Sequence, residues 1–113
     1  MDTDTMRDFC LSLKQTTEDI KWDHLCFCVG AKMYIITGFE DNSPTSFKVP
    51  EEDFDALTSR EGIVQAAHFA KRQWVTVMQR NKLKPKEWEH YINQSYEMVK
   101  QKLTKKLRGE LGL

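Results

Sequence analysis

The sequence lacks any long uninterrupted apolar run, although hydrophobic residues make up 40% of its 113 positions. No run approaches the roughly 20 residues that a membrane-spanning helix needs, so a membrane protein is not expected. The N-terminus, Met-Asp-Thr-Asp, lacks the basic start of a secretory signal peptide. Cysteine is scarce and odd in number, three in all, which argues against a disulfide framework. These absences together predict a protein of the reducing cytoplasm.

Motifs for catalysis and phosphate binding are also missing. The chain has no Gly-rich phosphate loop. None of its three histidines stands in a pattern that would pair it with a cysteine and an orienting acid. Cys10 falls on the apolar face of an expected helix, where a thiol has little reactivity. We therefore expect a protein that is not an enzyme and that uses no cofactor.

One group of residues has metal-ligand character. His24, Cys26 and Cys28 are spaced by two, and alternate residues of a strand project from the same face. The geometry is poor for a closed tetrahedral site, because structural zinc sites usually combine a pair spaced Cys-x2–4-Cys with a second pair elsewhere, and the sequence offers no second pair. Cysteines on a strand are more often small core residues. The sequence therefore favours the absence of a metal site, with metal binding as the open alternative.

Apolar alternation predicts five strands. They are rich in aromatic and β-branched residues, are separated by turn residues, and lie at positions 22–29, 32–39, 46–49, 63–69 and 73–78. In the first strand Leu25 and Phe27 should share a face. In the second, strict alternation places Met33 with Ile35 and opposite Tyr34. Residues 15–21 are polar and are expected to form a connection.

Helices are expected before, between and after these strands, at positions 4–14, 50–59 and 85–108. The last is the clearest, because apolar or small residues recur at helical spacing along it: Trp88, Ile92, Ser95, Val99, Leu103 and Leu107. Gly109 is the expected stop. The pattern as a whole predicts an α+β fold of one domain, residues 1–113, in which helices cover one face of an antiparallel sheet.

Charge is distributed unevenly along a chain whose net charge is zero. Residues 1–61 carry 13 acidic and 6 basic side chains, whereas residues 62–113 carry 4 and 11. Acids at helix starts and bases at helix ends, which the helix dipole favours, explain much of this asymmetry. The alternative is a basic face that meets nucleic acid. Its candidate residues are Lys48, His68, Lys71, Arg72 and Arg80, with Trp74 nearby.

Several stretches resemble the MmcQ/YjbR family. They are residues 22–33, which begin Trp-Asp-His-Leu-Cys, the strand around Lys48, the pattern His-x-x-Lys-x-x-Trp-x-x-Val from His68, and the Ser-Tyr pair at Ser95. The resemblance implies a small bacterial α+β domain with a frataxin-like (CyaY-like) arrangement. By fold-level analogy with a double-wing domain it also implies DNA binding. The sequence departs from the family at Cys28, where members commonly carry lysine, and at Val49, where they commonly carry cysteine.

Two functional hypotheses follow. The first is weak, phosphate-directed binding of double-stranded DNA by a non-enzymatic domain, as the resemblance implies. The alternative is an accessory domain that binds a protein or a small ligand. Iron binding by analogy with frataxin has little support, because the first helix offers only Asp2, Asp4 and Asp8 as an acidic ridge. We expect a monomer.

Overall fold

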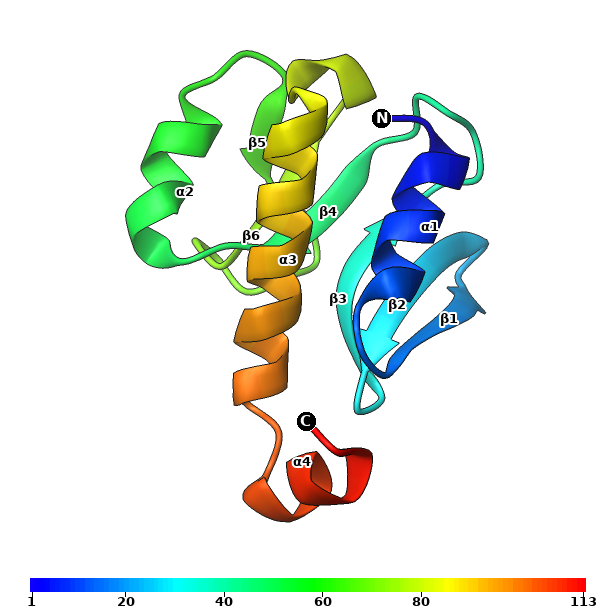
Figure 1. Ribbon diagram of the computed structural model, residues 1–113. Helices are drawn as coiled ribbons and strands as arrows, with labels where there is room; N and C mark the ends of the chain where they lie inside the picture. Colours follow the sequence, from blue (N-terminus) through cyan, green and yellow to red (C-terminus); the bar gives the residue numbers. More distant parts are fainter.

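A six-stranded antiparallel sheet with helices on one face organises the chain (Figure 1). The structure is a computed structural model that describes residues 1–113. In chain order the elements are α1 (Thr3–Ser12), β1 (Thr16–Lys21), β2 (His24–Val29), β3 (Lys32–Thr37), β4 (Thr45–Lys48), α2 (Glu51–Thr58), β5 (Ile63–Gln65), β6 (Trp74–Val77), a 3₁₀ turn η1 (Arg80–Lys82), α3 (Pro85–Gln101) and α4 (Lys105–Leu111). The strand order is β1-β2-β3-β4-β6-β5, so the α+β class is confirmed.

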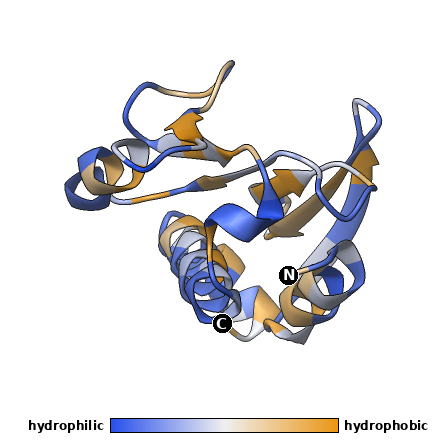
Figure 2. Cartoon of the chain, turned by 90° about the horizontal axis from the view of Figure 1, so that it is seen from above, coloured by the Kyte–Doolittle hydropathy of each residue, from blue (hydrophilic) through white to orange (hydrophobic).

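The helices leave one face of the sheet uncovered. Helices α1 and α3 lie on the same side of the strands, and α2 packs against β5 and β6 (Figure 2). The core lies between the sheet and the helices and includes the fully buried side chains of Phe27, Phe47 and Trp88. We call the other side, which no helix covers, the open face. None of the helices is both long and apolar enough to cross a bilayer.

Strand β1 is a correction to the sequence analysis, which expected a polar connection at residues 15–21. It pairs along its whole length with β2, from Thr16 opposite Val29 to Lys21 opposite His24. Its side chains are exposed or half-buried, because β1 lies at the edge of the sheet. An edge strand that buries no side chain shows no apolar alternation, and that is the signal from which strands are predicted.

A bulge in β3 reverses the expected direction of two side chains. Phe27 pairs with Ile35 and Cys28 pairs with Met33, so Tyr34 is an extra residue in the ladder. Tyr34 therefore turns into the core, where its hydroxyl lies 2.9 Å from that of Thr16. Met33 is left on the open face, opposite to the side that strict alternation predicts.

The long C-terminal helix is interrupted, which is a second correction. Helix α3 ends at Gln101, and α4 begins after Thr104, whose hydroxyl accepts a hydrogen bond from the Leu107 N–H (3.1 Å). Between them Leu103 is buried against Gly30, where an added Cβ would lie 2.6 Å from a Leu103 methyl carbon. Gly109 lies within α4, and Gly112 ends it with φ +70°.

The expected strand at residues 63–69 is also shorter than predicted. β5 ends at Gln65, because the chain turns at His68 and Arg72, which both have positive φ values, of 68° and 63°. Residues 66–73 thus form a loop that lies beside the open face. This loop contributes to both surfaces described below.

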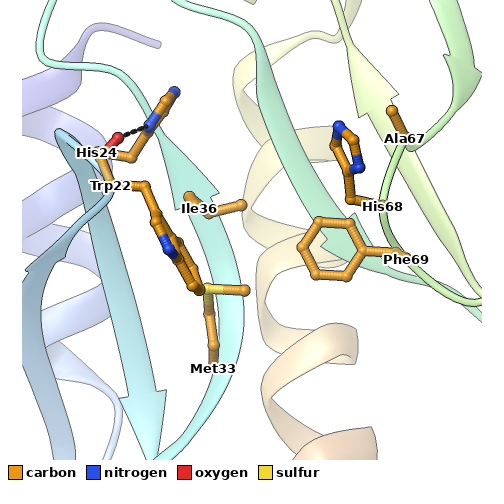
Figure 3. Close-up of a pocket in the computed structure, with 7 residues that line it drawn as sticks. All are labelled: Trp22, His24, Met33, Ile36, Ala67, His68 and Phe69. Carbon is orange, nitrogen blue, oxygen red and sulfur yellow. Dashed lines mark hydrogen bonds between the residues drawn. The ribbon is translucent and has the colours of Figure 1, made fainter.

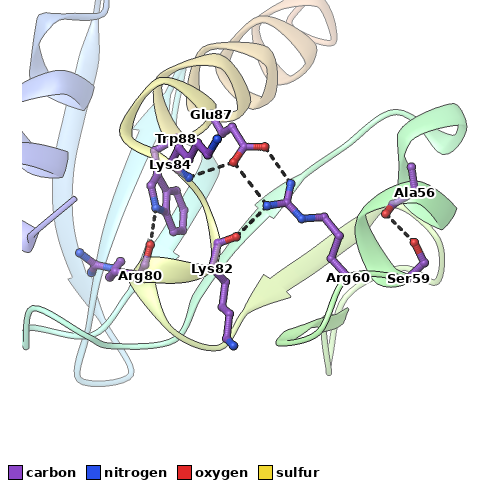
Figure 4. A network of polar contacts seen from close by, with 8 residues as sticks. All are labelled: Ala56, Ser59, Arg60, Arg80, Lys82, Lys84, Glu87 and Trp88. Atoms are coloured by element: carbon purple, nitrogen blue, oxygen red, sulfur yellow. Dashed lines mark hydrogen bonds and ion pairs between the residues drawn. The ribbon is translucent and has the colours of Figure 1, made fainter.

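The first turn of α3 is fixed by polar contacts (Figure 4). The Glu87 carboxylate accepts hydrogen bonds from the Lys84 N–H (2.9 Å) and from the Arg60 guanidinium (2.7 Å). The Arg60 side chain and the Lys84 N–H lower the pKa of Glu87 to about 2. Next to it, the indole N–H of Trp88 donates to the Arg80 carbonyl (2.8 Å).

Ser95 joins α3 to the sheet where two central strands separate. Its hydroxyl donates to the Tyr34 carbonyl (2.6 Å) and accepts from the Lys48 N–H (3.0 Å). The regular β3–β4 ladder ends at Ile35 opposite Phe47. The fully buried Ser95 hydroxyl therefore takes the place of the next ladder hydrogen bond.

Replacing Ser95 by alanine should lower the free energy of unfolding by about 2–4 kcal/mol. The change leaves the buried Tyr34 carbonyl and the part-buried Lys48 N–H without partners. A buried unmet group costs about 1–3 kcal/mol, and a part-buried one costs less. Ser59→Ala is the matched control, because that exposed hydroxyl donates only to the Ala56 carbonyl at the end of α2 (Figure 4). Urea unfolding should show a loss below about 0.5 kcal/mol for the control. Equal losses in the two variants would contradict the bridging role.

Candidate binding surfaces

An apolar pocket of about 480 Å³ lies on the open face. One wall comes from the β1–β2 turn and from strands β2 and β3, and the other from the loop that follows β5 (Figure 3). The lining residues are Trp22, His24, Met33, Ile36, Ala67, His68 and Phe69. Met33 reaches this pocket because of the bulge in β3.

Two of the lining residues have backbone conformations that L-residues rarely adopt. Trp22 has φ 51° and is followed by Asp23 with φ 58°, so the two form a hairpin turn of the kind that usually contains asparagine and glycine. His68 has φ 68° on the opposite wall. A tryptophan in this position is unusual, and 75% of its surface is exposed. The fold therefore holds a large aromatic side chain at the mouth of a pocket.

The two walls are supported by local contacts. The Phe69 ring stacks on Trp74 with centroids 4.3 Å apart, so it is anchored to β6. The His24 Nδ1 lies 2.6 Å from the Trp22 carbonyl oxygen and must donate to it, since a carbonyl only accepts. In the neutral ring this leaves Nε2 as an acceptor. His24 and His68 are thus the polar groups of an otherwise apolar lining.

The cysteines are placed where thiols are inert. Cys26 and Cys28 are covered by their neighbours, and burial raises the pKa of both thiols. Burial also raises the pKa of Cys10 to about 12. No three His, Cys, Asp or Glu side chains come together in a geometry that could hold a metal ion. His24, exposed, and the two covered cysteines of β2 therefore form no metal cluster.

The second surface is a hollow of about 280 Å³ where β4 meets α2, next to the end of α3. Three lysines line it, Lys48, Lys71 and Lys102, and we call it the lysine hollow. None of the three is in a salt bridge. Burial of the ammonium group, followed by the nearby charges of Lys102 and Lys32, lowers the pKa of Lys48 to about 8.

Arg72 lines the same hollow but is engaged elsewhere. Its guanidinium pairs with both carboxylate oxygens of Asp55, at 3.1 and 2.9 Å, and with Glu51 at 3.4 Å. It also lies over the Phe54 ring, 5.0 Å from the centroid. Arg72 thus fastens the loop to α2 and offsets part of the negative charge of Glu51 and Asp55 beside the lysine hollow.

Arg80 is not part of any surface, which corrects its place among the candidate residues. It is 4% exposed. Its guanidinium donates to the hydroxyls of Thr45 (3.0 Å), Thr3 (3.1 Å) and Thr37 (2.7 Å) and to the Met1 carbonyl (3.2 Å). Arg80 therefore ties the N-terminus to strands β3 and β4 and is unavailable to an external phosphate.

The basic residues proposed from the sequence as a nucleic-acid site thus lie on different surfaces. Lys48, Lys71 and Arg72 come together at the lysine hollow, whereas His68 lines the apolar pocket. Sequence reasoning missed Lys102, because cations at a helix end already have a structural explanation. It also missed the role of Trp22, although a tryptophan at a two-residue turn is a signal that could have been recognised.

These features define a small α+β domain with an antiparallel sheet and one open face (Figure 2). A model of the YjbR family matches residues 11–98. The chain therefore belongs to the YjbR family. No curated protein matches it.

Solved structures agree with this assignment. A crystal structure of a Deinococcus radiodurans protein with the family domain DUF419 is 30% identical, with a TM-score of 0.89 over 99% of this chain and 88% of that one. A Pseudomonas syringae protein shares the fold in a crystal structure (24% identity, TM-score 0.73, 88% and 99% coverage) and in a solution NMR structure (23%, 0.69, 88% and 93%).

Replacing Lys48 by methionine should stabilise the protein at pH 7. The folded-state pKa of Lys48, about 8, is below its usual value of 10.5, so folding disfavours the charged form. That penalty is complete below pH 8 and disappears as the pH rises toward 10.5. The stability difference between variant and wild type should therefore shrink over that interval. Urea unfolding at several pH values measures it, with exposed Lys86→Met as the control. A difference that does not change with pH would contradict the assignment.

Proposed function

We propose that this YjbR-family protein is a non-enzymatic domain that binds a small, planar aromatic ligand in the apolar pocket of the open face. The observation that carries the proposal is Trp22, an exposed indole held at the pocket mouth and facing a wall that includes Phe69 (Figure 3). A ring inserted between the two walls would contact aromatic side chains from both sides. Each favourable aromatic pair contributes about 0.5–1.5 kcal/mol beyond the burial of apolar area.

The size and chemistry of the pocket support this ligand class. Its volume, about 480 Å³, lies within the range of roughly 300–1,000 Å³ of small-molecule sites. The lining is mostly apolar, and His24 and His68 supply a few polar atoms that can orient a ligand. It contains no carboxylate, lysine or arginine, so a neutral ring system fits better than a charged one.

Backbone strain supports a function for the same residues. A residue held in a sparsely populated backbone region costs about 1–3 kcal/mol, and such residues are concentrated at functional sites. Trp22 and His68 are both in the left-handed region and belong to opposite walls of the pocket. Neither is buried in the core, so core packing does not require either of them. Of the six non-glycine residues with positive φ, these two line the pocket.

A fluorescence titration with N-phenyl-1-naphthylamine, a neutral aromatic probe, tests the proposal. We expect saturable binding that Trp22→Ala weakens by about tenfold, the equivalent of about 1.4 kcal/mol. Ala67→Leu places extra carbon in the pocket from an exposed loop position and should also block binding. Phe39→Ala is the matched control, because Phe39 is 52% exposed and lies outside the pocket. No saturable binding, or equal loss in Phe39→Ala, would refute the proposal.

Duplex DNA binding is a second candidate, with one favourable observation. Lys48 and Lys71 lie together with Lys102 around one hollow and have no acidic partners. Against it, Arg80 is buried and Arg72 is paired with Asp55. We therefore expect binding no tighter than the ~10⁻⁴–10⁻⁶ M of non-specific complexes at physiological salt.

A salt titration of duplex binding checks this candidate. The slope of log affinity against log salt should be about −0.9 per phosphate contact. Lys71→Ala should weaken binding to all sequences equally and make the slope shallower by about one unit. Arg72→Ala should change little, because that guanidinium is already paired. Absence of binding at low salt, or binding that Lys71→Ala leaves unchanged, would remove the candidate.

A further inference from the structure

The lysine hollow gathers like charges, none of which is in a salt bridge. Lys48 and Lys102 are close enough to perturb each other, and Lys32 adds a third positive charge nearby. Lys71 faces the same space from the loop after β5. Like charges held together are unfavourable unless an anion lies between them. No carboxylate of the protein pairs with any of these four lysines.

The acidic residues around the hollow are either paired with Arg72 or placed where they would repel an extended anion. Glu51 lines the hollow, but it and Asp55 are paired with Arg72. The first turn of α2 continues with Glu52 and Asp53, both acidic. An anion that stays inside the hollow meets mainly lysines, whereas an extended polyanion would also cross the acidic start of α2. Charge complementarity therefore favours a small anion over a long one.

We propose that the lysine hollow binds one compact phosphorylated anion, of the size of a diphosphate or a small phosphate ester. Lys48, Lys71 and Lys102 supply the ammonium donors, and Val49, Pro50 and Met98 provide apolar contacts in the lining. The volume, about 280 Å³, is near the lower end of small-ligand sites, which suits a ligand of this size.

The position of Lys48 distinguishes this hollow from scattered surface lysines. Its backbone N–H is held by the Ser95 hydroxyl of α3 at 3.0 Å, and the next residue, Val49, donates to the Gln73 carbonyl of the loop at 3.0 Å. The strand that carries Lys48 is thus fixed to both other walls of the hollow. A preorganised site loses less entropy when it binds a ligand.

Calorimetric titration with inorganic pyrophosphate at low ionic strength tests the inference. We expect one saturable site, and each of Lys48→Met and Lys71→Met should weaken it about tenfold or more, as expected for loss of one charge-assisted hydrogen bond. Lys86→Met, an exposed lysine at the other end of α3, should leave it unchanged. Because Lys48→Met is expected to be the more stable protein, its loss of binding would not reflect unfolding.

Two further measurements identify which class of anion the lysine hollow binds. A short DNA duplex at equal phosphate concentration should bind more weakly than pyrophosphate, and sulfate should not replace pyrophosphate at the same concentration. Stronger binding of the duplex, equal competition by sulfate, or equal losses in Lys48→Met and Lys86→Met would each overturn the inference. The lysine hollow shares Lys48 and Lys71 with the surface proposed for DNA. It shares no residue with the apolar pocket, so failure of aromatic-probe binding and failure of pyrophosphate binding can be told apart.

Discussion

The buried hydroxyl of Ser95 fixes the relation between helix α3 and the sheet. It replaces a ladder hydrogen bond between β3 and β4, so the two strands separate without leaving a backbone group unpaired. Both candidate surfaces depend on this arrangement. The bulge beside Tyr34 puts Met33 into the apolar pocket, and the end of α3 brings Lys102 next to Lys48. Ser95 thus contacts the backbone of Tyr34, next to Met33 of the apolar pocket, and of Lys48, which lines the lysine hollow.

The buried guanidinium of Arg80 has a related role at the other end of the sheet. It satisfies three threonine hydroxyls and a carbonyl from parts of the chain that are far apart in sequence. Such a group could be mistaken for a nucleic-acid contact, because basic residues are usually exposed. Here the charge is used to close the fold, whereas Lys48, Lys71 and Lys102 line a hollow at the surface. Arg80 differs from these lysines in that its side chain is buried.

The fold was predictable from the sequence where buried side chains are apolar and recur with a regular period. The strand with Leu25 and Phe27 was recognised from its aromatic and β-branched residues, and the helix with Trp88 and Ile92 from its periodicity. Strand β1 was not predictable, since an edge strand with exposed side chains has no apolar period. The bulge at Tyr34 and the break before Thr104 lie where the chain contacts residues distant in sequence, Ser95 and Gly30, which a local pattern does not reveal. Of the candidate site, the sequence grouped Lys48 with Lys71 correctly but could not reveal that Arg80 is buried.

The two edge strands of the sheet, β1 and β5, affect how the protein can interact with other polypeptide chains. Strand β1 carries Glu18, Asp19 and Lys21, and β5 at the opposite margin is three residues long. Charged or very short margins are poor templates for strand addition by another polypeptide. The apolar pocket can therefore be open to solvent while the sheet edges disfavour edge-to-edge aggregation. Strand addition at either edge is therefore disfavoured, whereas the open face is not restricted in this way.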